Sequence, residues 1–166
     1  MLATIILQIS SLLITPAQLS TSALSIKDPS VVYEPAYVRV DYPCGDVTQG
    51  TGVCTDVVIR AFLQLDVCLQ KEIHEYRLSE GLSVDRNIDH RRVPEQGQYF
   101  ASQGWEIDVD SEVLPGDIIW WKLNGRVNHI GIVLADGTVM HNIGRGQIHD
   151  VRPHSYSMHR LFRLAE

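Results

Sequence analysis

The chain has 166 residues, of which 45% are hydrophobic and 20% are charged, and its formal net charge is −6. This length and composition are typical of one globular domain with a sizeable core, and they exclude a disordered chain and a polytopic membrane protein. The acidic balance argues against a general nucleic-acid binder, for which a basic surface is expected. We therefore expect a single domain that binds no nucleic acid.

The N-terminal segment has the features of a secretory leader. Residues 1–23 carry no charged side chain, and an apolar run over 2–14 is followed by Pro16 and the small residues 21–23. A helix breaker and small residues after such a run are typical of an export signal, and the run is short for a transmembrane span. The alternative is a buried N-terminal helix. We expect a leader over 1–23, export to the periplasm or the medium, no stable membrane insertion after cleavage, and one domain over 24–166.

The first clear helix follows a glycine-rich loop over residues 45–52. Apolar side chains at spacings of three and four run from Cys54 to Leu65, so a helix begins at Cys54 with that side chain at the head of its buried face. Free N–H groups and the positive end of the helix dipole favour a thiolate at this position. A second helical stretch covers 69–82, and a short helix ends near Gly104.

Beyond residue 114 the hydrophobic pattern changes to that of strands and tight turns. The predicted strands are 118–123, 129–134, 138–142 and 158–164, with turn signals at Asn124–Gly125 and Asp136–Gly137. Helices followed by an antiparallel meander predict an α+β domain in which N-terminal helices pack on the sheet.

His129 opens the second of these strands. Alternation puts His129, Gly131 and Val133 on one face and apolar side chains on the other. The glycine leaves room beside the histidine for a substrate or a helix end. If the helix that begins at Cys54 packs across this face, Cys54 and His129 meet as a nucleophile and its base.

A third polar group is needed to orient the imidazole, and hairpin register decides which residue supplies it. A two-residue turn pairs Gly131 with Asn142, which places Asn142 on the face of His129. A three-residue loop with Gly137 in the left-handed conformation pairs Gly131 with His141 instead. Both loops are common, so His141 and Asn142 both remain candidates.

Three cysteines are an odd number, so in an oxidising compartment at least one remains free or pairs with another chain. If Cys44 and Cys68 pair, the free thiol is Cys54, as a nucleophile requires. The alternative is that Cys68 is a buried apolar side chain. The spacing alone leaves both possibilities open.

Metal binding is the rival chemistry, because the chain has seven histidines. A zinc ion held by Cys54, His129 and His141 is conceivable. However, the histidines form neither an i, i+4 helical pair nor part of a CxxC knuckle, which are the spacings expected of zinc sites. We therefore expect neither a metal nor another cofactor.

Five stretches in order carry a resemblance to a known superfamily. They are GDV at 45–47, GVCTDVVIR at 52–60, NIDHRRVP at 87–94, PGDI at 115–118 and HNIG at 141–144. A cysteine at a helix start, a His-hydrophobic-Gly-hydrophobic strand and a histidine ending the next strand resemble the NlpC-type papain-like cell-wall peptidases and amidases. The five stretches look like an uncharacterised bacterial family within that superfamily, and the resemblance covers most of the chain from Tyr42 onward.

This resemblance implies a papain-like α+β fold and a cysteine hydrolase that cleaves an amide bond of peptidoglycan peptide through a thioester. It implies that Cys54 is the nucleophile, His129 the general base and then acid, and His141 the orienting residue. Tyr42 corresponds to an upstream tyrosine that contacts substrate in some relatives. Thr55 and Asp56 depart from the Ser-Gly that commonly follows the cysteine, which implies a different wall to the substrate cleft.

The polar stretch 87–92 has two interpretations. Its charges pair among themselves in a solvated loop, or Arg91 or Arg92 clamps a substrate carboxylate while Asp89 holds the arginine. Within enzymes, an acyltransferase is the alternative to a hydrolase. A non-catalytic cell-wall-binding module is the alternative outside them. We expect a monomer whose partner is peptidoglycan or cell-wall peptide.

Overall fold

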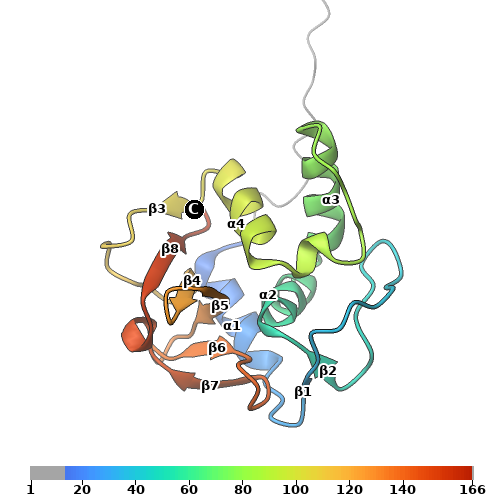
Figure 1. Cartoon of the computed structure of the whole chain (residues 1–166). Coiled ribbons are helices and arrows are strands. Elements are labelled where there is room, and N and C mark those ends of the chain that lie inside the picture. Colours follow the sequence, from blue (N-terminus) through green and yellow to red (C-terminus); the bar gives the residue numbers. More distant parts are fainter. Residues whose placement is uncertain (1–13, 166) are drawn as a thin grey trace, which may run out of the picture.

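The computed structural model describes residues 14–165, with the helices between residues 54 and 102 on one side of the molecule and the sheet on the other (Figure 1). The helices are α1 (Pro16–Ser25), α2 (Cys54–Leu63), α3 (Leu69–Ser79) and α4 (Val93–Ser102), with short 3₁₀ turns η2 (Asp89–Arg91) and η3 (Pro153–Ser155). The strands are β1 (Val32–Tyr33), β2 (Thr51–Gly52), β3 (Glu106–Ile107), β4 (Ile118–Leu123), β5 (Val127–Val133), β6 (Val139–His141), β7 (Ile148–Val151) and β8 (Met158–Phe162).

The main sheet has six strands in the order β3-β8-β4-β5-β6-β7, and every neighbouring pair is antiparallel. β1 and β2 form a separate parallel pair. The prediction of an α+β domain with an antiparallel sheet is confirmed. β3 and β7 are not predictable from the sequence pattern, because each is a short strand at an edge of the sheet without a clear alternation of polar and apolar residues.

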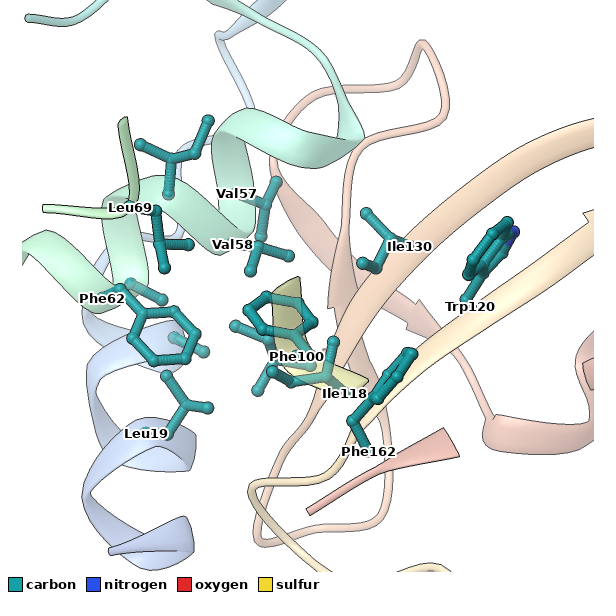
Figure 2. Packing of buried hydrophobic residues seen from close by; sticks show 14 of the residues in the cluster. Leu19, Val57, Val58, Phe62, Leu69, Phe100, Ile118, Trp120, Ile130 and Phe162 are labelled. Carbon is teal, nitrogen blue, oxygen red and sulfur yellow. The ribbon is translucent and has the colours of Figure 1, made fainter. Parts of the chain in front are cut away.

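The core lies between α2 and one face of this sheet (Figure 2). Val58 and Phe62 of α2 are fully buried, as are Ile118 and Ile130 of the facing strands, and Phe100 of α4 closes the layer. Complete burial of an aliphatic or aromatic side chain contributes about 1.5–3 kcal/mol. α2 therefore packs its buried side chains on the apolar face of β5, which offers the larger area to bury. It does not pack across the face of His129, which was the condition under which the sequence allowed Cys54 and His129 to meet.

α1 belongs to the same core. Thr15 caps the helix through the backbone N–H of Gln18, and Leu19 and Ala23 are fully buried in the core cluster to which α2 contributes. Residues 16–23, which the sequence analysis placed in the leader, thus lie in the folded domain as the alternative interpretation had it. Residues 1–13 lie outside the described part of the chain, so the leader itself stays a prediction.

Between residues 14 and 165, no helix combines the length and the apolar character that crossing a membrane requires.

A disulfide joins Cys44 to Cys68 and ties the loop before α2 to the start of α3. Cys54 remains as a buried free thiol. The pairing that the sequence left open is therefore the one that leaves Cys54 available for chemistry.

Candidate active site

Cys54 occupies the first position of α2, and the side chain of Asp56 stabilises the helical turn that carries it. Val53, which precedes the helix, has no side-chain cap; instead its N–H donates to Asp56 Oδ2 over 2.7 Å. Arg91 donates Nε–H and Nη2–H to the two oxygens of the same carboxylate, each over 3.0 Å. Asp56, one of the two residues that depart from the common Ser-Gly pattern, thus stabilises the turn that carries the candidate nucleophile.

Arg91 is fully engaged in this anchoring. Its guanidinium also donates to the carbonyl oxygens of Ala36 and Glu34, each over 3.4 Å, and the residue is only 6% exposed. No bidentate edge is left for a substrate carboxylate. The interpretation of Arg91 as a substrate clamp is therefore corrected: its side chain connects the approach segment to α2.

Both arginines line the pocket at Cys54, but the side chain of Arg92 is 52% exposed whereas that of Arg91 is buried. Asp89 is buried and forms its shorter ion pair, 3.2 Å, with Arg77, while Arg92 Nη1 lies 3.8 Å away. Asp89 also accepts a hydrogen bond from the N–H of Asp85. Asp89 therefore stabilises the loop, and Arg92 is the arginine placed for a ligand.

The pocket beside Cys54 has a volume of about 330 Å³. Tyr33, Arg92 and Asn128 give it polar walls. Sequence reasoning missed Tyr33, because only the pairing of Tyr33 with Gly52 in the β1–β2 ladder brings it near Cys54. Burial raises the pKa of Tyr33, and the charge of Cys54 acts in the same direction.

Tyr42, the tyrosine expected at the site, lies elsewhere. Its ring makes an edge contact with His74 at 5.3 Å and lies 5.3 Å below the guanidinium of Arg86. It lines a separate polar pocket with Tyr37 and Arg39. The structure therefore does not bring Tyr42 to the nucleophile.

Burial raises the pKa of the Cys54 thiol to about 11. The backbone N–H of Ile130 acts against this, the charge of Asp56 reinforces it, and the N–H groups of Thr55 and Cys54 lower it again. The helix N-terminus thus favours the thiolate, as the sequence analysis expected, but burial outweighs it. The N–H of Ile130 belongs to the peptide unit that follows His129, so the sulfur meets β5 beside the histidine.

The His129 imidazole is buried among aromatic side chains and His141. Its Nε2 lies 2.8 Å from Nδ1 of His141, and its ring stacks on Trp121 with centroids 5.5 Å apart and planes 14° from parallel. Burial lowers the pKa of His129 to about 3, and His141 adds to the effect. Among residues 14–165, no hydrogen bond joins this imidazole to the Cys54 thiol.

The hairpin register decides between the two candidates for the orienting residue. Ile132 pairs with Met140, and Gly137 is left-handed at φ 76°, so β6 continues with His141 on the face of His129. Asn142 points the other way and donates to the carbonyl of Gly52 over 3.3 Å. His141 is thus the imidazole's partner, and Asn142 supports the loop before the nucleophile.

Gly131 permits this approach of the two histidines. A Cβ at position 131 would lie 2.7 Å from Val139 Cγ1 and 2.8 Å from the carbonyl oxygen of Met140. The space that the sequence analysis reserved for a substrate or a helix end is therefore filled by β6. The glycine serves close strand packing instead.

Asp150 of β7 is a further residue that the sequence analysis did not identify. Its Oδ1 lies 2.7 Å from Nε2 of His141, and its Oδ2 lies 2.8 Å from Nη2 of Arg145. The missed strand β7 carries it, so no motif or spacing indicated its place. Burial lowers the pKa of His141, while the hydrogen bond and charge of Asp150 act to raise it.

Across residues 14–165, His, Cys, Asp and Glu side chains form no group of three or more with the geometry of a metal site.

Comparisons place the chain in a family but name no activity. The chain belongs to a family described as a domain of unknown function, DUF1287, whose model matches residues 20–164. That range holds Cys54, His129, His141 and Asp150. The chain is 41% identical to the uncharacterised protein YijF of Escherichia coli (strain K12), over 70% of this chain and 66% of YijF. The chain thus spans just under two thirds of that relative's length.

Proposed function

We propose that this protein is a cysteine-dependent hydrolase with a papain-like, NlpC-type fold that cleaves an amide bond in bacterial cell-wall peptide. The observation that carries the proposal is the placement of a free Cys54 thiol at a helix start, against the peptide unit that follows His129. The imidazole of His129 is held by His141 through Nε2. A thiol, a base and an orienting group in this order are the parts that acyl transfer to cysteine requires.

The resting site holds a neutral thiol and a neutral imidazole, because burial raises one pKa to about 11 and lowers the other to about 3. His129 therefore acts as a general base during attack rather than as a preformed imidazolium. Since Nε2 is occupied by His141, the proton of Cys54 passes to Nδ1. Hydrogen bonds of this kind tighten when substrate binds, so their absence from the free protein does not conflict with the role.

Attack by sulfur on the amide carbon produces an oxyanion, which the backbone N–H of Cys54 at the helix start stabilises; one such donor is worth about a hundredfold or more in rate. The tetrahedral intermediate collapses as His129 returns the proton to the leaving amine, and a thioester remains. Water, deprotonated by His129, then attacks the thioester carbonyl and releases the acid and the thiol.

The pocket supports a peptide substrate that carries carboxylates. Arg92 presents an exposed guanidinium beside the nucleophile in a chain of net charge −6, and this group binds carboxylates through two parallel hydrogen bonds. Stem peptides of the cell wall carry several such groups. The Cys44–Cys68 disulfide supports an oxidising compartment outside the cytoplasm, where disulfides persist.

The test is mass spectrometry of soluble products after purified peptidoglycan is incubated with the protein or with its Cys54→Ala variant. We expect new peptide-bearing fragments from the wild-type protein alone, and their masses identify the bond. Activity of a folded Cys54→Ala variant would overturn the role of Cys54. Binding to sacculi without products from either form, with Cys54 still open to alkylation, would replace the hydrolase by a wall-binding module. Products that carry an added amine acceptor would indicate acyl transfer.

A further inference from the structure

A continuous chain of hydrogen-bonded groups runs from His129 to the surface. His129 Nε2 and His141 Nδ1 are 2.8 Å apart, His141 Nε2 and Asp150 Oδ1 are 2.7 Å apart, and Asp150 Oδ2 and Arg145 Nη2 are 2.8 Å apart. Trp121 covers the inner end of the chain, where it stacks on His129 and makes an edge contact with His141. The inner members are buried, and only the Asp150–Arg145 pair reaches solvent.

The terminal carboxylate determines the direction of every hydrogen bond in this chain. An ionised carboxylate only accepts, so His141 must donate from Nε2. A neutral imidazole has one donor and one acceptor, so Nδ1 of His141 must then accept from Nε2–H of His129. By the same rule, Nδ1 of His129 carries a lone pair and no proton. Among the described residues nothing else donates to that nitrogen.

The surroundings of Asp150 keep its carboxylate ionised, so that it can only accept hydrogen bonds. Burial acts to raise the pKa of Asp150, but the His141 hydrogen bond and the charges of His141 and Arg145 outweigh it and keep the pKa below its usual value. Arg145 also occupies the second carboxylate oxygen.

We propose that Asp150 is a positioning residue that sets the tautomers of His141 and His129 and so leaves His129 Nδ1 as the unprotonated base for the Cys54 thiol. The inference rests on the proposed function of Cys54 and His129. It concerns a residue that touches neither the substrate nor the nucleophile and acts through two imidazoles. Removal of its charge reverses the chain: an asparagine amide donates to His141 Nε2, His141 Nδ1–H donates to His129 Nε2, and Nδ1 of His129 carries the proton.

The experiment compares the wild-type protein with Asp150→Asn, Asp150→Glu and, as a control, Asp110→Asn. Asp110 is exposed in the segment that follows β3, and β3 lies at the edge of the sheet opposite to β7, which carries Asp150. Ring ¹⁵N NMR reports the tautomers directly, with resonances assigned from a His141→Gln variant. We expect Nε2–H on both histidines in the wild type and in Asp110→Asn, Nδ1–H on both in Asp150→Asn, and the wild-type pattern again in Asp150→Glu.

Peptidoglycan hydrolysis provides the second readout. We expect kcat of Asp150→Asn to fall at least about 100-fold with KM unchanged, because the wrong tautomer cannot accept the thiol proton. A wild-type protein with Nδ1–H on His129, or an Asp150→Asn variant with unchanged tautomers and kcat, would overturn the inference. If the wild type hydrolyses nothing, the proposed function fails, yet the NMR comparison still decides the tautomers. If Asp150→Asn does not fold, the question is decided by the histidine tautomers that ring ¹⁵N NMR reports for the wild type, Asp150→Glu and Arg145→Gln.

Discussion

Asp56 and Arg91 form a buried, two-pronged ion pair two residues beyond the candidate nucleophile, with both N–O distances at 3.0 Å. The pair joins the first turn of α2 to η2. Oδ2 of Asp56 also accepts a hydrogen bond from the backbone N–H of Val53. The geometry of Cys54 therefore depends on an ion pair whose two partners are 35 residues apart in the chain.

We expect Arg91→Ala to lower the free energy of unfolding by about 3–5 kcal/mol, because it leaves the Asp56 carboxylate buried without its partner. Urea denaturation measures this change. Arg92→Ala is the matched control, since its side chain is half exposed and its ion pairs are long, and it should shift stability by no more than about 0.5 kcal/mol. Equal losses from the two variants would contradict the structural role of Arg91.

Arg92 should matter for substrate instead. We expect Arg92→Ala to raise KM for peptidoglycan peptide about tenfold or more, the loss of one charge-assisted contact, with little change in kcat. Arg92→Lys keeps the charge but not the planar fork and should recover only part of the effect. Steady-state kinetics on a soluble stem peptide, and on the same peptide with amidated carboxyl groups, measure both. An unchanged KM in Arg92→Ala would remove Arg92 from the binding site.

The Cys54 thiol should react as a buried, protonated thiol. Because the thiolate is the nucleophile and burial raises the pKa to about 11, iodoacetamide should alkylate Cys54 slowly at pH 7 and faster as the pH rises towards 11. Intact-protein mass spectrometry follows the single free cysteine. A rate plateau between pH 5 and pH 8 would show a preformed thiolate–imidazolium pair and would contradict the neutral resting state.

Stability should fall in mild acid because two buried histidines resist protonation. The pKa of His90 is lowered to about 4 by burial, opposed by Asp56, and that of His129 to about 3. Unfolded chains bind these protons near pH 6.5, so as the pH falls below 6.5 only the unfolded state gains charge and stability is lost. Each histidine lowers the free energy of unfolding by about 1.4 kcal/mol per pH unit until the pH reaches the pKa of that histidine in the folded state. Urea titrations from pH 7 to pH 4.5 should show a shallower loss in His90→Gln; an identical slope would contradict this assignment.

The disulfide should stabilise the fold without a role in chemistry. Its two cysteines are 24 residues apart, and a loop of that length is worth roughly 3 kcal/mol. We expect the double variant Cys44→Ser and Cys68→Ser to lose about that amount in urea denaturation while Cys54 remains open to alkylation. Cys54→Ser should retain the disulfide and lose much less stability.

Much of the fold could be read from local patterns. The helix at Cys54 and the strands beginning at Ile118 and Met158 lie where periodicity placed them, because each has a regular apolar face and a clear turn at its start. The strand β7 and the role of α1 could not be read in this way. β7 is short and mixed in polarity, and α1 has the small and apolar residues that a cleaved leader also has.

The sequence by itself determined the candidate residues Cys54 and His129 and the α+β order of the elements, since residue type and hydrophobic period are local properties. Only the tertiary structure decided which of two loops closes the β5–β6 hairpin, and so that His141 rather than Asn142 contacts His129. It also decided that Arg91 is buried in an ion pair while Arg92 is exposed in the pocket, and that Tyr33 and Asp150 belong to the candidate site. These outcomes depend on burial and on contacts between distant segments. Two neighbouring residues of the same type, such as Arg91 and Arg92, look alike in the sequence although their surroundings in the fold differ.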